Sequence, residues 1–379
     1  MTVIIFLIVL AVLIFVHELG HFLAARAFGI RVDAFKIGFG PKLFKCKRGE
    51  TEYGLNLIPF GGYVKIFGED PDAASTSGPD AARSFVNKAR WKQAIVLVSG
   101  VLFNFIFAWL LYIIVFASGT TVAADDFRRY ADSFKDERVM VTYVMPDSPA
   151  DKVGLKYGDI IRYVETTAMN VVRARSAYVP TDERKKQSVE EIQDIVNSFG
   201  NKPVAFEFER NKSRNTIGVT PVGGLVEGKY AIGIAMKDIA DVRIPFGFAI
   251  WEGFRYTLVM IRETAVALYT FIANIVIGQP DFADVAGPIG IAGIVGSAAK
   301  MGMTYLLMIT AIISINLGVV NLIPFPALDG GRILFVAIES ATRRRIPAKF
   351  SNIVNFVGFA LLMILMVVVT FKDIVKIWR

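Results

Sequence analysis

Both histidines of this 379-residue chain lie in one five-residue motif, His17-Glu18-Leu19-Gly20-His21. Histidines four positions apart project from the same face of an α-helix, so both imidazoles can bind one metal ion. Glu18 lies one position along, beside the space where a water molecule would be activated. This arrangement suits zinc-dependent hydrolysis with Glu18 as the general base. The motif also arises by chance, so its meaning depends on the rest of the chain.

A catalytic zinc site needs a third protein ligand that leaves one position open. The chain has no further histidine, so a carboxylate must serve, and the best candidate is Asp329 in the segment 321–332, NLIPFPALDGGR. The two prolines before Asp329 are expected to break a helix, and the two glycines after it to allow a tight turn. A helix cap or a turn residue is the alternative role for Asp329.

The composition places this chemistry in a membrane protein. Hydrophobic residues make up 54% of the chain and charged residues 20%, which excludes a disordered or fibrous protein. The single cysteine, Cys46, excludes a disulfide scaffold and is interpreted as an ordinary free thiol. Four apolar segments are long enough to be transmembrane helices: 3–25, 94–118, 303–323 and 353–371. A signal peptide is the alternative for the first segment, but no basic residue precedes its apolar run.

Charged and basic residues near these segments add two constraints. A glutamate and two histidines inside a membrane are costly unless they are paired or bind something, which favours the zinc site, with a structural metal or a proton relay as the alternative. Lys and Arg are concentrated after the first segment, before the second and between the last two, so these loops are expected to be cytoplasmic. The termini and residues 119–302 then lie on the far side, and the site lies near the cytoplasmic face. These loops also explain the net charge of +8 without a nucleic-acid partner.

Residues 138–237 are predicted to form a small extramembrane domain. Its strand-like segments are Arg138–Val144, Ile160–Glu165, Val204–Arg210, Thr216–Pro221 and Tyr230–Met236. A capping box formed by Ser188 and Glu191 predicts a helix that stops at Gly200. The run 146–161 resembles the PDZ signature of bacterial proteases, whose domains bind peptides or C-termini by strand addition. A small β-rich domain without a ligand is the alternative, and 166–187 is expected to be a loop.

The sequence therefore predicts a polytopic α-helical membrane protein with four transmembrane helices and an inserted PDZ-like, mainly-β domain. Its predicted parts are 1–119 with the first two spans, 138–237 as the PDZ-like domain, 238–302 as a surface helix with a linker, and 303–379 with the last two spans. Residues 244–277 carry interleaved charges and are interpreted as an amphipathic helix on the membrane surface, with a fifth span as the alternative. Residues 287–292 are interpreted as a glycine-punctuated link.

Taken together, these motifs resemble the site-2 protease family (M50-type intramembrane zinc metalloproteases), specifically the bacterial RseP type. The resemblance rests on the histidine motif, on Leu328-Asp329-Gly330 and on the PDZ-like run. Further matches are Gly38–Pro41, Pro59–Lys65, Gly100 with Asn104, Gly287–Gly290, and Asn316 with Asn321. Known members of the RseP type carry two PDZ domains, whereas this chain has room for one.

The resemblance implies a zinc endopeptidase of a bacterial inner membrane that cuts transmembrane segments inside the bilayer. His17, His21 and Asp329 would hold Zn²⁺, and Glu18 would activate water. Asn316 and Asn321 would lie near the site and hold an unwound substrate or an oxyanion, with interhelical hydrogen bonding as their alternative role. The segment Tyr53–Lys65 would form a membrane-associated β-hairpin, and Gly61, Gly62 and Tyr63 would bind the substrate by strand addition.

The implied substrates are single-span proteins already shortened by another protease, such as anti-sigma factors or remnant signal peptides. A peptide or C-terminus would be a second ligand at the PDZ-like domain. A membrane-anchored PDZ scaffold with a vestigial metal site is the alternative function, although it would have no need of Glu18 between the ligands. A transporter is disfavoured, because the sequence shows no internal repeat.

Overall fold

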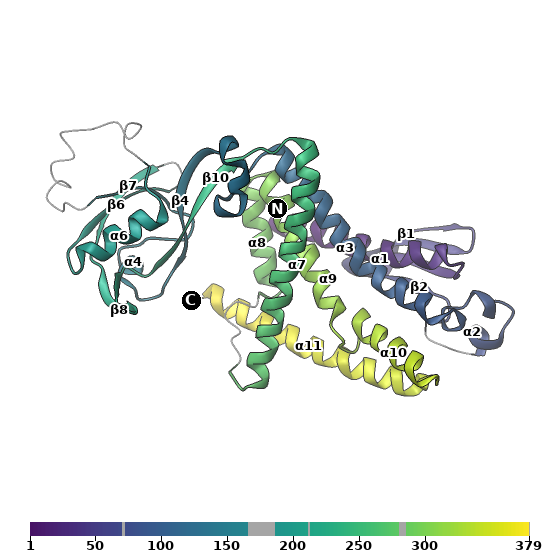
Figure 1. The fold of residues 1–379 in the computed structure, drawn as a ribbon. Helices are drawn as coiled ribbons and strands as arrows, with labels where there is room; N and C mark the ends of the chain where they lie inside the picture. The colour runs from purple at the N-terminus through teal and green to yellow at the C-terminus, as the bar shows by residue number, and fades with distance from the viewer. Residues whose placement is uncertain (70–72, 166–185, 211–212, 280–285, 379) are drawn as a thin grey trace. The chain divides into compact units, whose positions relative to one another are not determined.

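The computed structural model describes residues 1–69, 73–165, 186–210, 213–279 and 286–378 (Figure 1). It divides into two compact units, one of Met1–Ala117 with Pro245–Arg379 and one of Ser118–Ile244. The predicted loop 166–187 lies almost entirely outside the described residues. The longer helices of the first unit are α1 (Thr2–Ala27), α3 (Arg90–Ser118), α7 (Phe246–Val276), α8 (Pro288–Met301), α9 (Met303–Leu322), α10 (Asp329–Thr342) and α11 (Ala348–Trp378).

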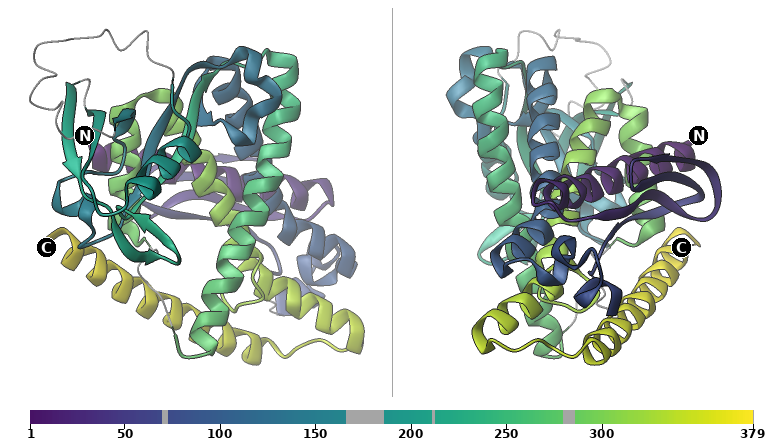
Figure 2. Two further views of the ribbon diagram at one scale, coloured as in Figure 1. Left: turned by 60° about the vertical axis from the view of Figure 1, so that its left-hand side comes forward. Right: turned by 90° about the vertical axis from the view of Figure 1, so that its right-hand side faces the viewer.

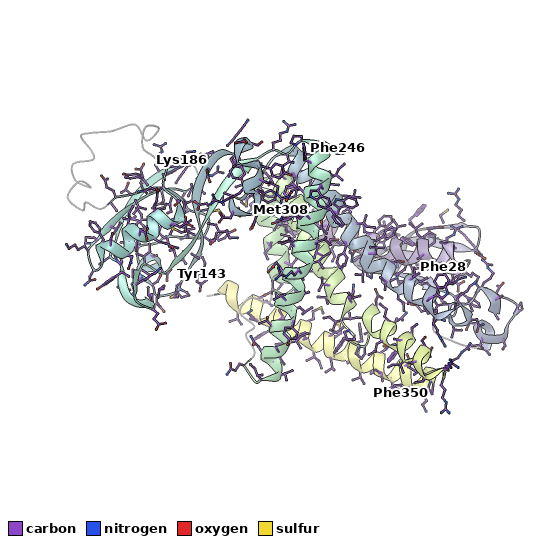
Figure 3. All side chains as sticks on the ribbon, in the orientation of Figure 1. Phe28, Tyr143, Lys186, Phe246, Met308 and Phe350 are labelled. Atoms are coloured by element: carbon purple, nitrogen blue, oxygen red, sulfur yellow. The ribbon has the colours of Figure 1, made fainter. Side chains whose placement is uncertain are left out.

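Five of the described helices are long and apolar enough to cross a membrane: α1, α3, α7, α9 and α11. Four contain the predicted spans. The count of four is not confirmed, because α7 meets the same criterion although it was interpreted as a surface helix. It carries only four charged residues, Glu252, Arg255, Arg262 and Glu263, so apolar residues dominate its length. Most of its large apolar side chains are exposed, beginning with Phe246 (Figure 3). Exposed apolar residues along the length of a helix are typical of contact with lipid.

A glycine-rich link was predicted at residues 287–292, and this prediction is wrong. Residues from Pro288 onward form the helix α8, with Pro288 in its first turn, where its missing N–H costs nothing. The buried carboxylate of Asp373 in α11 accepts a hydrogen bond of 2.7 Å from the Gly290 N–H. A Cβ on Gly287 would lie 2.7 Å from the same carboxylate, so the glycine allows α11 to cap α8.

Two long strands, β1 (Val32–Arg48) and β2 (Thr51–Ile66), follow α1 and form an antiparallel sheet with several register shifts. Residues 34–37 of β1 pair with 62–65 on one side and with 52–55 on the other. The prediction that Tyr53–Lys65 forms a hairpin by itself is therefore wrong, because the segment lies wholly within β2. Positive φ angles at Gly38, Gly40 and Gly61 allow these strands to bend back.

An ion pair joins the two strands where residues 34–37 are paired on both sides. Lys36 Nζ, on a largely buried side chain, lies 2.6 Å from Glu52 Oε1, and Lys42 Nζ lies 3.3 Å from the same oxygen. The hydrogen bond from Lys36, with that from Lys42, lowers the pKa of Glu52 to about 2. Glu52 is thus ionised across the physiological pH range.

The chain bends between α9 and α10, as the two prolines predicted. Phe325 N–H donates to the Ile323 carbonyl at 2.7 Å, and Ala327 adopts a positive φ of 73°. Gly330 and Gly331 were expected to allow the turn, but both belong to the first turn of α10. A Cβ on Gly330 would lie 2.1 Å from the Ile323 carbonyl oxygen. The glycines are therefore required for close packing of α10 under the bend and not for backbone freedom.

The second unit is built on a six-stranded sheet with the order β3-β10-β4-β5-β6-β7. Its strands are β3 (Thr120–Ala123), β4 (Lys135–Val144), β5 (Ile160–Glu165), β6 (Val204–Arg210), β7 (Ser213–Val219) and β10 (Ile234–Val242), beside a small sheet of β8 (Val222–Val226) and β9 (Lys229–Ala231). Residues 160–165 and 204–210 are strands with the predicted bounds. The single strand predicted at Tyr230–Met236 is two, because Gly233 has a φ of 82°.

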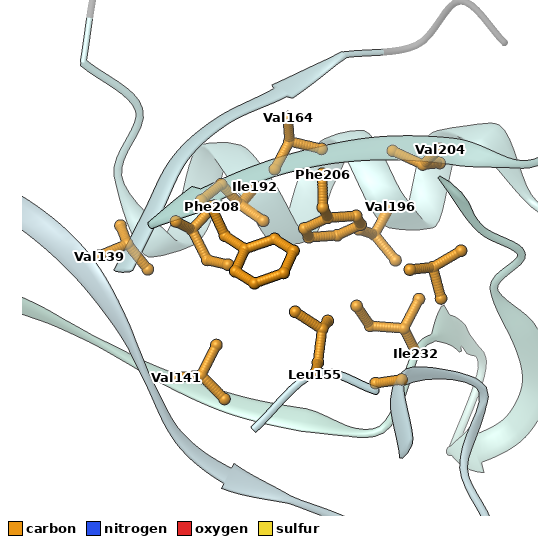
Figure 4. Packing of buried hydrophobic residues seen from close by; sticks show 13 residues of the cluster. Val139, Val141, Leu155, Val164, Ile192, Val196, Val204, Phe206, Phe208 and Ile232 are labelled. Atoms are coloured by element: carbon orange, nitrogen blue, oxygen red, sulfur yellow. The ribbon is translucent and has the colours of Figure 1, made fainter. Parts of the chain in front are cut away.

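Helix α6 (Val189–Phe199) lies beside the strands of this unit (Figure 2) and covers its apolar core (Figure 4). Phe206 and Phe208 from β6 pack there with Leu155, Ile192 and Val196, all buried. The Ser188 and Glu191 side chains form the predicted capping box at the start of α6. Burial of this core supplies the hydrophobic driving force for folding the unit.

The PDZ-like run contains two tight turns, as its glycines predicted. Gly154 and Gly158 have φ angles of 84° and 88°, which only glycine adopts readily. The carboxylate of Asp159 is 1% exposed and pairs with the Arg210 guanidinium at 2.6 Å. The PDZ-like identity of the unit stays a prediction.

Candidate active site and metal centre

Three side-chain atoms from α1 and α10 converge at one point. His17 Nε2 and His21 Nε2 lie 3.3 Å apart, and Asp329 Oδ2 lies 3.1 Å from the first and 3.2 Å from the second. The two histidines are one turn apart on α1, and Asp329 is the first residue of α10. The structure thus brings together the three residues that the sequence proposed as ligands.

This geometry fits a tetrahedral metal ion. Tetrahedral nitrogen and oxygen ligands at 2.0–2.1 Å from a zinc ion are about 3.3–3.4 Å from one another, close to the three observed separations. Asp329 Oδ2 is buried and accepts no well-formed hydrogen bond from any residue that the structure describes. An orphaned carboxylate oxygen between two imidazoles is costly unless a cation binds there.

Helix α3 contacts both histidines of the site. The Val96 carbonyl oxygen lies 2.8 Å from His21 Nδ1, and the Asn104 side chain lies 3.1 Å from His17 Nδ1. Between them, a Cβ on Gly100 would lie 2.4 Å from His21 Nε2 and 2.8 Å from His17 Cε1. Gly100 therefore leaves the space that the two imidazoles occupy.

Strand β2 contacts the proposed general base. Val64 N–H donates to Glu18 Oε2 at 2.9 Å, which fixes one oxygen of the carboxylate. A Cβ on Gly62 would lie 2.8 Å from Ile14 Cγ2 and 3.0 Å from the Lys36 carbonyl oxygen. Gly62 thus allows β2 to approach α1 closely enough for this hydrogen bond.

Two ion pairs connect α10 to other elements of the first unit. Arg332, one turn after Asp329, pairs with Glu69 in the turn after β2. Glu339, two turns further along α10, pairs with Arg90 at the start of α3 at 2.6 Å. These four residues are among those that line a cavity of about 90 Å³. The pairs restrain the helix that carries Asp329.

The predicted substrate-binding residues lie in different environments. Asn316 in α9 accepts a hydrogen bond of 3.0 Å from the Thr264 hydroxyl of α7, which is the interhelical role left open from the sequence. No hydrogen bond or ion pair joins Asn316 or Asn321 to the three converging groups within the described residues. Gly61 and Tyr63 flank Gly62 on β2, beside α1.

Sequence reasoning noted Gly100 and Asn104 only as matches to a pattern and assigned them no role. Their spacing of four residues on an apolar helix was the available signal, because it matches the spacing of the two histidines. The contact between Val64 and Glu18 had no local signal, since a backbone N–H is present at every residue other than proline. Such contacts depend on the approach of β2 to α1.

Comparison with known proteins decides the family. The sequence model of peptidase family M50 matches residues 5–365 of this chain. The chain belongs to peptidase family M50. A relative from Clostridium perfringens, named as a candidate zinc metalloprotease, is 36% identical over 99% of each chain. Zinc metalloprotease RasP from Geobacillus kaustophilus is 28% identical over 99% of this chain and 98% of that protein.

This M50 peptidase is therefore a zinc metalloprotease of the site-2 protease type and a membrane protein. Its cofactor is Zn²⁺. Within the described residues, His17, His21 and Asp329 form a cluster that could hold such a metal ion.

Proposed function

We propose that the protein is an intramembrane zinc endopeptidase that hydrolyses peptide bonds within transmembrane segments of single-span membrane proteins. The observation that carries the proposal is the convergence of His17, His21 and Asp329 within 3.3 Å of one another. Two of these residues belong to a helix apolar enough to span a bilayer. A hydrolytic site on such a helix meets a membrane-embedded substrate more readily than a soluble one.

The three converging residues are assigned as the zinc ligands. When bound, Zn²⁺ supplies Lewis-acid activation of water and of the scissile carbonyl. Glu18 follows the first ligand on α1 and accepts the proton of the attacking water, as a general base does. Its carboxylate is held by the Val64 N–H, which leaves its other oxygen, Oε1, for this proton transfer.

Strand β2 is assigned to substrate binding, with Gly61, Gly62 and Tyr63 as the contact residues. Its 62–65 arm pairs with β1 on one side, and the Val64 N–H on its other side points at Glu18. A substrate strand added along that edge would lie against the base. Strand pairing also keeps the substrate unwound, and an intact helix would hide its carbonyls from a nucleophile. Asn316 and Asn321 on α9 are assigned to holding the unwound strand, Asn316 after release from Thr264.

The second unit is assigned a peptide or C-terminus as ligand. The first residues of β10 pair with β4 on one side, while β3 pairs only with residues 239–242. A cavity of about 190 Å³ lies between α6 and this segment, lined by Val196, Ile234 and Met236 among others. Within the described residues, no strand pairs with this other edge of the first β10 residues, and an open edge beside the amphipathic helix α6 supports binding by strand addition.

We further propose a bacterial inner-membrane location. The N-terminus and the second unit would be periplasmic, and the site would lie near the cytoplasmic face. The substrates would be proteins already shortened by another protease, with anti-sigma factors and remnant signal peptides as the family's examples.

The test uses full-length protein in detergent with a single-span model substrate. We expect zinc-dependent cleavage by the wild type and loss of cleavage, with zinc retained, in Glu18→Gln. Full activity of Glu18→Gln would overturn the mechanism. Full zinc occupancy in the double variant His21→Ala, Asp329→Ala would overturn the ligand assignment. Peptide binding by the second unit without any proteolysis would instead support a membrane-anchored scaffold.

A further inference from the structure

Helix α3 presents three successive groups to the histidines of α1. Val96, Gly100 and Asn104 are spaced four residues apart and thus lie along one face of α3. The first offers a carbonyl oxygen to His21 Nδ1 and the last offers its amide to His17 Nδ1. Both imidazoles therefore have a polar partner behind them, on the side away from Asp329.

The two partners are not chemically equivalent. The Val96 carbonyl can only accept, so the His21 proton sits on Nδ1 and its Nε2 lone pair faces Asp329. The Asn104 amide can donate through Nδ2 or accept through Oδ1. As placed, Nδ2 faces His17 Nδ1 at 3.1 Å, while Oδ1 is buried and has no hydrogen-bond partner in the described part of the chain.

A ligand role for His17 decides between the two orientations. If Nδ2 donates to Nδ1, the ring proton must sit on Nε2, and that nitrogen then has no lone pair for a metal. A half-turn of the amide places Oδ1 against Nδ1. This exchange satisfies the orphaned oxygen, accepts the Nδ1 proton and leaves the Nε2 lone pair free.

We propose that Asn104 is a positioning residue of the zinc site, whose amide oxygen accepts the Nδ1–H of His17. It thereby sets the ring tautomer and the direction of the Nε2 lone pair. Its side chain is completely buried, and its backbone carbonyl accepts a hydrogen bond of 2.8 Å from the equally buried Ser314 of α9. This anchor connects α9 to the partner of the first ligand.

The inference rests on the proposed zinc ligands but not on the proposed substrate, so the test reads the imidazoles and the metal directly. The chain has only two histidines, so labelling with ¹⁵N-histidine gives signals from just four ring nitrogens. We expect both rings of the zinc-loaded, full-length protein to carry the proton on Nδ1. A His17 ring that carries it on Nε2 in the zinc-loaded protein would overturn the inference.

Two substitutions separate an acceptor from a donor. Asn104→Leu has a similar volume and no acceptor, and we expect it to shift the His17 signals, leave those of His21 in place and weaken zinc binding about 10- to 100-fold. Asn104→Asp keeps an acceptor and loses the donor, and we expect zinc affinity at or above that of the wild type. Gly293→Ala is the control, since its added Cβ meets nothing within 4 Å, and it should bind zinc as the wild type does.

The outcomes divide cleanly. Wild-type zinc affinity in Asn104→Leu would overturn the positioning role. Equal weakening in the Leu and Asp variants would overturn the acceptor role. Should Asn104→Asp fail to fold, the tautomer observed in the wild type still decides. A wild type without bound zinc would contradict the proposed site itself and not only the role of Asn104.

Discussion

The space above Gly100 offers the sharpest test of the metal centre. The substitution Gly100→Ala adds one methyl group to α3 and suits the helix better than glycine does. The added Cβ would lie 2.4 Å from His21 Nε2, 2.7 Å from its Cε1 and 2.8 Å from His17 Cε1. An ordinary contact needs about 3.4 Å, so the His21 ring would have to move by about 1 Å.

Such a shift exceeds what a zinc site tolerates. Ligand distances in metal sites hold to within about 0.2 Å, so a 1 Å displacement removes His21 as a ligand. The ring also cannot swing away freely, because its Nδ1 hydrogen bond to the Val96 carbonyl at 2.8 Å would be lost. Disturbing a ligand's partner alone costs about 10- to 100-fold in affinity, so displacing the ligand itself should cost at least ~100-fold.

The assay is competition between the purified full-length protein and a chelator at buffered free zinc. Gly293→Ala is the control, since an added Cβ on that exposed residue of α8 meets nothing within 4 Å. We expect Gly293→Ala to bind zinc as the wild type does. Gly100→Ala should lose zinc while the metal-free protein remains folded. Wild-type zinc affinity in Gly100→Ala would refute the assignment of the site.

Three further predictions concern the elements around the site. Gly62→Ala should lower cleavage about 10- to 100-fold with zinc retained, because β2 must withdraw from the general base. The control Gly54→Ala, which has room for its Cβ, should remain active. Loss of activity in both variants would count against a local effect at Gly62. Arg210→Ala should destabilise the second unit by about 3 kcal/mol, because it leaves the buried Asp159 carboxylate without its ion-pair partner. Amide hydrogen exchange in the second unit measures this loss, and unchanged protection would contradict the prediction. The lowered pKa of Glu52 means that its ionised carboxylate should stabilise the β1–β2 sheet above pH 4.5, and that this contribution should be lost as the pH falls toward 2. Amide hydrogen-exchange protection of β1 and β2, corrected for intrinsic exchange rates, should therefore fall between pH 4.5 and pH 2. An equal fall in Glu52→Gln would show that Glu52 is not the cause.

Local patterns allowed correct predictions from the sequence. The spacing of His17 and His21 placed both imidazoles on one face, and their scarcity required a carboxylate such as Asp329. The capping box at Ser188 and the strands 160–165 and 204–210 are likewise properties of a few neighbouring residues. Such features depend on periodicity and backbone propensity and do not require knowledge of the tertiary fold.

Features set by tertiary packing could not be predicted in this way. The helix α8 depends on a carboxylate from Asp373, 83 residues away, at its first turn. The glycines after Asp329 were interpreted through backbone freedom, while the structure uses their missing side chains under the bend. The long β2 strand was mistaken for a hairpin, whereas its residues 52–55 and 62–65 both pair with residues 34–37 of β1. In each case the deciding partner lies far away in the sequence.

The central claim is that Glu18 and the three converging residues cleave a peptide bond within a membrane-spanning segment. The most direct measurement reconstitutes the full-length protein and a single-span substrate in one bilayer and maps the product ends by mass spectrometry. We predict new ends inside the apolar segment with the wild type and zinc, and none with Glu18→Gln at equal zinc content. Equal cleavage by Glu18→Gln, or product ends only outside the apolar segment, would contradict the account.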